Sequence, residues 1–148
     1  KAGGIVEAMH AKIFEMTEPG LRKNELVAEI YRTAIRGTED AGGDYPAIVP
    51  LLPSGEDASA SHLTWDDQPM RSGEATFFEI AGVHKRYHCP LSRTIYLGKP
   101  TQDILDAEKA VLEGLEEGLQ KAQPGNTCDQ DGLAVRGRRR DADDEARG

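Results

Sequence analysis

His62 and Glu79 are the two residues whose types and settings suit acid–base chemistry. His62 ends a polar run that begins at Ser54, and Glu79 interrupts the otherwise apolar run Ala-Thr-Phe-Phe-Glu-Ile-Ala-Gly. If that run is a strand, its alternation places Phe77, Glu79 and Ala81 on one face. A carboxylate among apolar groups is costly unless it is ion-paired, binds a metal or has a raised pKa that catalysis uses.

Each of these two residues has a structural alternative. The Glu79 carboxylate could be paired with Lys85, Arg86 or Arg93, or it could be the remnant of a metal site. As a catalytic group it would act as a nucleophile or as a general base beside a histidine. His62 could instead be a loop histidine that caps a turn.

Three further side chains are candidates for binding a small cation. Trp65 lies in the same polar loop as His62, and its aromatic face could attract a cation. Tyr87 could do the same, or it could belong to the core, as is expected of Phe77 and Phe78. Asp57 could pair with a cationic group or could be a solvated loop charge. Cys89 is expected to be buried and inert.

The histidines offer little support for a metal site. His84 and His88 are four residues apart, and on one strand this spacing would separate them by roughly 13 Å, too far for a shared ion. His10 falls near the apolar side of a predicted helix, where a histidine at the edge of the core is expected rather than a ligand.

Composition limits the partners. The chain has 148 residues and a formal net charge of −8, which argues against nucleic acid or an anionic membrane surface as the main partner. No run is long and apolar enough to cross a bilayer, and no signal peptide is visible. Two cysteines do not make a disulfide framework, so a cytoplasmic location is expected.

Apolar periodicity predicts helices over 2–16 and 23–36, with Gly37 ending the second. The second helix is expected to bury Ile35 along with its other apolar residues. A strand over 47–52 would be an edge or irregular strand because it contains Pro50. A long loop over 53–74 is followed by strands at 75–82 and 84–98, with Gly82 helping the chain to reverse.

A third helix is predicted over 101–122, with an apolar stripe from Ile104 to Leu119. A weak repeat relates its end, Gln-Pro-Gly, to the end of the first helix, Glu-Pro-Gly, and would require a fourth helix near Thr127. Residues 126–148 show no apolar period and carry blocky charge, so an irregular and disordered tail is expected there.

Several motifs together resemble the creatinase and aminopeptidase, or pita-bread, family, and most closely its ectoine hydrolase branch. They are Pro-Ala-Ile-Val-Pro at 46–50, the Ser-Gly loop ending in His62, Arg-Ser-Gly-Glu at 71–74, Glu-Ile-Ala-Gly at 79–82 and Cys-Pro-Leu-Ser-Arg-Thr at 89–94. The resemblance covers about residues 1–128. It implies an α+β fold: half of a pita-bread domain over 1–125, with helices packed on a curved antiparallel sheet. We expect the second half to be missing because of an interrupted gene or reading frame.

The resemblance also bears on metal binding. Family aminopeptidases hold two metal ions, and their first two aspartates match Glu79 and Pro90 here. Proline has no side-chain donor, so neither a metal nor another cofactor is expected. In the metal-free branch the histidine matching His62 acts as acid or base.

By this resemblance, His62 and Glu79 would open the cyclic amidine ring of ectoine or 5-hydroxyectoine to an N-acetyl-diaminobutyrate, with Trp65, Asp57 and Tyr87 binding the substrate. The partner would be that small molecule, and the full-length protein would form a homodimer. The alternatives are a metal-dependent Xaa-Pro aminopeptidase or dipeptidase, and an inactive fragment or binding domain.

Overall fold

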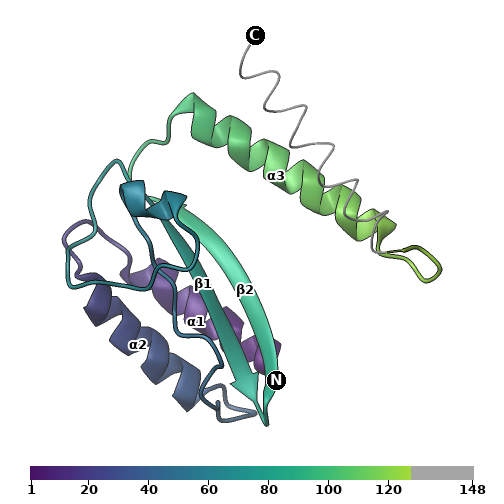
Figure 1. The fold of residues 1–148 in the computed structure, drawn as a ribbon. Helices are drawn as coiled ribbons and strands as arrows, with labels where there is room; N and C mark the ends of the chain where they lie inside the picture. The colour runs from purple at the N-terminus through teal and green to yellow at the C-terminus, as the bar shows by residue number, and fades with distance from the viewer. Residues whose placement is uncertain (128–148) are drawn as a thin grey trace. The chain divides into compact units, whose positions relative to one another are not determined.

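The computed structural model describes residues 1–127, and contacts divide the chain into a unit of Lys1–Lys99 and a second unit that begins at Pro100. The first unit contains helix α1 (Ala2–Met16), helix α2 (Lys23–Arg36), the short 3-10 helix η1 (Gly55–Ser59) and the strands β1 (Ala75–His84) and β2 (Tyr87–Tyr96). The second contains helix α3 (Gln102–Lys121). Figure 1 shows the two strands as a curved antiparallel hairpin, which gives the expected α+β class.

The two first helices form where periodicity predicts them. In α1 the side chains of Ile5, Met9 and Ile13 recur at helical spacing and are buried. In α2 the chain leaves the helix at Gly37, whose φ of +71° suits a residue without Cβ. The expected burial of Ile35 is wrong: the residue is 50% exposed and is not among the residues that α2 buries.

The hairpin turns later than predicted. Residues Lys85 and Arg86 both have positive φ values, 50° and 72°, as a two-residue turn between His84 and Tyr87 requires. Gly82 therefore does not reverse the chain; it lies inside β1. A Cβ at Gly82 would come 2.4 Å from the carbonyl oxygen of Ala2, so its role is to let α1 approach the strand closely.

The segment 47–52 is not a regular strand. It reaches β1 through an isolated bridge at Leu51, and a second bridge follows at Ser54. Pro50 and Pro53 have no backbone N–H to donate to a neighbouring strand, which explains the irregular pairing. The loop over 53–74 also contains one element that periodicity did not reveal, the 3-10 helix η1.

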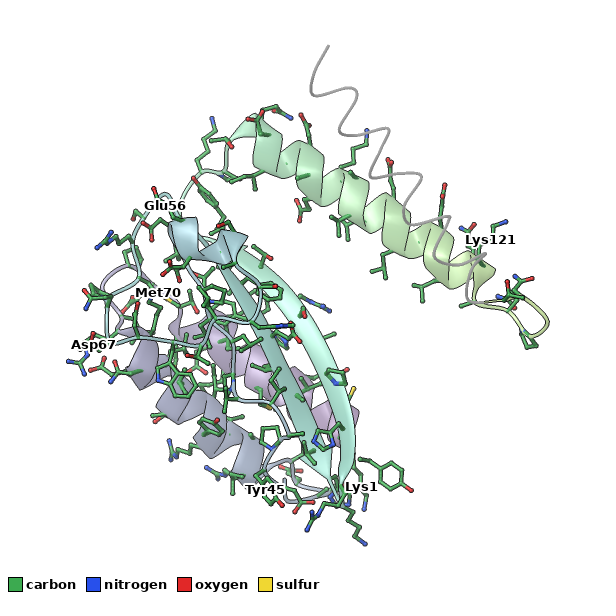
Figure 2. The ribbon with its side chains drawn as sticks, viewed as in Figure 1. Lys1, Tyr45, Glu56, Asp67, Met70 and Lys121 are labelled. Atoms are coloured by element: carbon green, nitrogen blue, oxygen red, sulfur yellow. The ribbon has the colours of Figure 1, made fainter. Side chains whose placement is uncertain are left out.

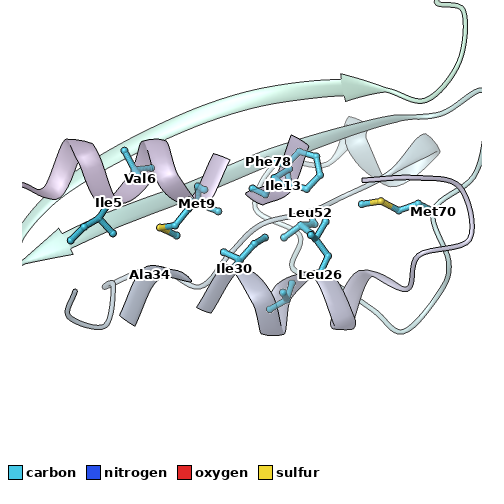
Figure 3. Packing of buried hydrophobic residues seen from close by; sticks show 12 residues of the cluster. Ile5, Val6, Met9, Ile13, Leu26, Ile30, Ala34, Leu52, Met70 and Phe78 are labelled. Carbon is cyan, nitrogen blue, oxygen red and sulfur yellow. The ribbon is translucent and has the colours of Figure 1, made fainter. Parts of the chain in front are cut away.

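One core joins these elements. Helix α1 packs on both strands and α2 packs on α1, so α1 makes most of the contact between the helices and the hairpin. Figure 3 shows Phe78 of β1 and Leu52 of the irregular segment meeting the apolar faces of both helices. At about 25 cal/mol per Å² of apolar surface, burial of this kind is the main term that stabilises the unit.

Helix α3 belongs to the second unit. It begins after Thr101 and carries Asp103 in its first turn and Lys121 in its last, which suits the helix dipole. Within this unit the side chains of Val111, Leu112 and Leu115 are more than half exposed. None of the described helices has the length and hydropathy that a membrane span needs. The expected tail lies, from residue 128 onward, outside the described residues.

Candidate functional site on the hairpin and its long loop

Glu79 lies at the middle of β1, between two neighbouring chain segments. Its backbone pairs with Ser92 of β2 on one side, and on the other it exchanges hydrogen bonds of 3.1 and 3.0 Å with Leu51. The alternation along β1 turns Phe78 and Ile80 toward α1, so Phe77, Glu79 and Ala81 share the opposite face as predicted. The Glu79 carboxylate has no salt bridge among the described residues, and Arg86 and Arg93 donate elsewhere.

His62 lies in the exposed part of the long loop. Its φ of 65° is in the left-handed region, which is uncommon for a residue with a Cβ. The side chains from Ser61 to Thr64 are all exposed. Both proposed catalytic groups belong to the first unit, but no hydrogen bond or ion pair in residues 1–127 joins His62 to Glu79.

The start of this loop is fixed to β1 by buried hydroxyl groups. Ser54 Oγ and Thr76 Oγ1 lie 2.8 Å apart, and both side chains are buried. The next residue, Gly55, has a φ of +60°, and a Cβ there would lie 3.0 Å from the carboxylate carbon of Glu74. Glycine suits this position because of its backbone conformation and because the Glu74 carboxylate lies close by.

The end of the loop is fixed to α2. Trp65 packs edge-on against Tyr31, with ring centroids 6.3 Å apart, and Lys23 Nζ reaches the two carboxylate oxygens of Asp66 at 2.9 and 3.0 Å. Desolvation by itself would raise the pKa of Asp66. Hydrogen bonds from Lys23 and from the Gln68 amide lower it by more, so the pKa lies below its usual value. Trp65 is therefore a partly buried anchor beside the core.

A polar pocket of about 400 Å³ lies between these two anchors. Its carboxylates outnumber its cations, which favours a ligand with a positive charge. Asp57 lines this pocket, and its role in substrate binding remains a prediction. Figure 2 shows the neighbouring Glu56 at this end of the unit. The residues that line it are Lys23, Ser54, Glu56, Asp57, Asp66, Gln68, Pro69, Arg71 and Glu74.

Tyr87 lies at the other end of the hairpin. It opens β2 beside the turn, whereas the pocket adjoins Ser54, which pairs with Thr76 near the start of β1. The eight residue steps from Thr76 to His84 correspond to roughly 26 Å of strand. Figure 2 shows Glu56 and Tyr45 at opposite ends of the unit, and Tyr45 contacts Arg86 at the turn. The structure therefore does not bring Tyr87 and Asp57 to one small-molecule site.

His84 and His88 lie on different strands, so the assumption of one continuous strand is wrong. His84 Nδ1 donates to the Gly42 carbonyl at 3.0 Å, while His88 Nε2 accepts the Ala47 amide at 3.0 Å. Both histidines tie the segment that leads to Leu51 onto the hairpin. Cys89 is partly buried against the core, less completely than predicted.

His10 and Lys23 are buried polar side chains whose burial and contacts are not evident from the local sequence. His10 is 5% exposed, donates from Nε2 to the Leu91 carbonyl at 3.1 Å and leaves its Nδ1 without a partner among the described residues. Burial lowers the pKa of His10, so the neutral ring is favoured. In the sequence Lys23 marks only the start of a helix, and no local signal distinguishes a buried lysine from an exposed one.

The donor set on the strands does not fit a pair of metal ions. Glu79 and Pro90 share the face of the hairpin that points away from α1, since Pro90 pairs with Ala81. Pro90 offers no side-chain ligand. In residues 1–127, no three histidine, cysteine or acidic side chains converge as a metal site would need. The absence of a metal cofactor remains a prediction.

Comparisons with known proteins agree with the motifs. The chain is 61% identical over 130 residues to an ectoine hydrolase of Halomonas elongata, an alignment that covers 84% of this chain and 33% of the relative. It is 30% identical over 128 residues to an Xaa-Pro aminopeptidase of Escherichia coli, covering 86% of this chain and 28% of that one. The chain therefore spans about a third of the length of these relatives.

Solved structures show the same fold. The dipeptidase PepE of Mycobacterium ulcerans matches with a TM-score of 0.83 and 22% identity, over 95% of this chain and 37% of that one. The prolidase of Pyrococcus furiosus matches with a TM-score of 0.82 and 20% identity, over 95% and 40%. Both likenesses support the pita-bread fold, of which this chain is a part.

The family model described as metallopeptidase family M24 matches residues 1–142, and so extends past residue 128, where the motif resemblance was expected to end. This match covers nearly the whole chain and includes the hairpin, the long loop and the polar pocket. The chain belongs to metallopeptidase family M24.

Proposed function

We propose that this chain supplies one part of a catalytic domain that hydrolyses ectoine or 5-hydroxyectoine to an N-acetyl-diaminobutyrate. The observation that carries the proposal is the 61% identity over 130 residues to the ectoine hydrolase of Halomonas elongata. That identity is twice the 30% shared with the Xaa-Pro aminopeptidase of Escherichia coli. The alignment with the ectoine hydrolase covers 84% of this chain and so includes both strands and the long loop.

The reaction requires two kinds of group. Water adds to the ring carbon between the two nitrogens, one carbon–nitrogen bond breaks, and the departing nitrogen takes up a proton. Glu79 would act as the base that activates water, or as a nucleophile on that carbon, and His62 would carry the proton to the leaving nitrogen. The carboxylate of Glu79 suits this role because it has no salt bridge in the described part of the chain.

Substrate binding would use the charges of the pocket. An amidinium ring is a cation, so Asp57 of the pocket would attract it. Trp65, which is in the same loop but does not line the pocket, would offer its aromatic face. Tyr87 lies beside the hairpin turn, far from Asp57. It could bind substrate only if the substrate lay outside the polar pocket or in another copy of the chain.

A second candidate is a metal-dependent Xaa-Pro aminopeptidase or dipeptidase. It is favoured by the family description and by the relatives that carry those names. Pro90 counts against it, because the strand position that should provide a second carboxylate has no donor. A third candidate is a chain that is inactive without the rest of its catalytic domain. A homodimer in the cytoplasm remains part of the main proposal.

The test is isothermal titration of ectoine into this chain, with and without added Mn²⁺ or Zn²⁺. We expect metal-independent binding of ectoine that weakens at least about tenfold in His62→Ala. The matched control is Ser61→Ala, the neighbouring exposed loop residue, which should bind like the wild type.

The other outcomes each favour one alternative. Binding of metal ions without binding of ectoine would overturn the proposal in favour of the aminopeptidase. Binding of neither would overturn the claim that this part of the chain contains a functional ectoine site, and would favour the inactive fragment.

A further inference from the structure

Lys23 is an unusual residue for its position. It is the first residue of α2, where the unpaired amides of the helix carry a partial positive charge that disfavours a cation. Its side chain is only 8% exposed, so its ammonium group has lost most of its hydration. Neither feature helps α2 to form.

The ion pair of Lys23 with Asp66 offsets these costs without giving a clear gain in stability. Lys23 is buried while the Asp66 side chain is 45% exposed, so the lost hydration of the ammonium costs free energy that an attraction weakened by solvent only partly returns. Global stability therefore does not explain the pair. What the pair does achieve is a fixed contact between α2 and a loop 43 residues away in sequence.

Asp66 transmits that contact to the backbone of the loop. Its Oδ1 also accepts the amide of Gln68 at 2.9 Å, and the Gln68 carbonyl accepts the amide of Lys23 at 3.2 Å. Met70 donates its amide to the Leu21 carbonyl at 2.8 Å. The segment from Asp66 to Met70 is thereby fastened to the start of α2 by side-chain and backbone bonds together.

His62 lies four residues before this fastened segment. The four exposed residues from Ser61 to Thr64 depend for their placement on the anchors at either side. Ser54 with Thr76 comes before them, and Trp65 with Tyr31 and Asp66 with Lys23 come after them. The left-handed φ of His62 costs about 1 kcal/mol or more for a residue with a Cβ. A loop without firm anchors would therefore relax to a more favourable backbone conformation at His62.

We propose that Lys23 and Asp66 are positioning residues that hold the loop carrying His62 in one conformation, in addition to lining the polar pocket. This inference rests on the proposed role of His62 for its catalytic meaning. The conformational claim itself concerns only the loop and its ion pair.

The experiment measures backbone ¹⁵N order parameters and the coupling constant that reports φ at His62 in the whole chain. The variants are Lys23→Met, which keeps an apolar stem, Asp66→Asn, which keeps an acceptor for Gln68, and the double variant. Glu29→Gln is the matched control, because it breaks the exposed pair of α2 with Arg32. Urea unfolding of each variant reports global stability.

We expect an order parameter at His62 near 0.8 in the wild type and in Glu29→Gln, and below about 0.6 in both single variants. Asp66→Asn leaves the buried Lys23 ammonium without its carboxylate, and the double variant removes that ammonium. The urea midpoint of the double variant should therefore recover from that of Asp66→Asn toward the wild type, while His62 stays mobile. Recovery of stability without recovery of order separates positioning from a merely structural role.

Three results would overturn the inference: a mobile His62 already in the wild type, an unchanged order parameter in the single variants, or recovery of order in the double variant. Titration of ectoine into the same samples tests the proposed function separately. Failure of the wild type to bind ectoine would count against that function, while the order parameters would still decide the role of Lys23 and Asp66.

Discussion

Leu51 and Glu79 exchange both of their backbone hydrogen bonds, so the candidate catalytic strand has a neighbour on each side. The regular hairpin supplies β2 on one side, and the irregular segment supplies Leu51 on the other. The same segment continues through Ser54 into the loop that carries His62. The strand with the candidate carboxylate and the loop with the candidate imidazole are therefore joined by backbone pairing near Glu79.

Replacing Glu79 by glutamine should abolish ectoine turnover without unfolding the chain. Its carboxylate has no salt bridge within residues 1–127, so we expect the free energy of unfolding to change by less than about 0.5 kcal/mol. Loss of a general base costs about 10²- to 10⁴-fold in rate. Two measurements compare the variant with an active wild-type preparation: the rate of ectoine turnover and the free energy of unfolding in urea. Ordinary turnover by the variant would show that Glu79 is not catalytic.

Stability should fall as the pH falls below about 6.5 because of His10. Burial lowers the pKa of His10 in the folded chain. As the pH falls, His10 is therefore protonated in the unfolded chain before it is protonated in the folded chain, which favours unfolding. The contribution of the neutral ring is complete above the unfolded pKa and is lost progressively from there toward the folded pKa.

The measurement for His10 is the urea midpoint at several pH values between about 5 and 8, in the wild type and in His10→Gln. Glutamine can still donate to the Leu91 carbonyl but does not titrate, so the decline between about pH 6.5 and 5 should flatten. A decline of equal slope in both proteins would rule out His10 as its cause.

Gly82→Ala should destabilise the first unit by about 1–3 kcal/mol. The new methyl group would lie 2.4 Å from the Ala2 carbonyl oxygen and 2.5 Å from the Val6 amide nitrogen, so α1 would have to move away from the strand. Gly42→Ala is the control, since its Cβ would meet nothing within 4 Å. Equal urea midpoints for the two variants would contradict the close packing of α1 on β1.

Ser54→Ala should cost about 1–3 kcal/mol, because the Thr76 hydroxyl would then be buried without its partner. Thr76→Val should be similar, and the double variant should cost less than the sum of the two. Ser61→Ala, at an exposed position, should be neutral. Additive costs in a double-mutant cycle of urea unfolding would show that the two hydroxyls do not interact.

The sequence alone determined the local elements and the family. Periodicity located α1, α2 and α3 to within about a residue, because the spacing of apolar side chains is a property of the element itself. Alternation placed Phe77, Glu79 and Ala81 on one face of β1 for the same reason. The motifs around His62 and Pro90 indicated the family that the comparisons then established.

Tertiary structure decided which distant residues meet. Nothing near Lys23 in sequence predicts its pairing with Asp66, because burial of a side chain depends on what packs over it. Likewise Gly82 looks like a turn residue until α1 is found against it, and Tyr87 looks like a companion of Asp57 until the hairpin separates them. Contacts between residues far apart in the chain follow from how the faces pack, and local patterns do not encode that packing.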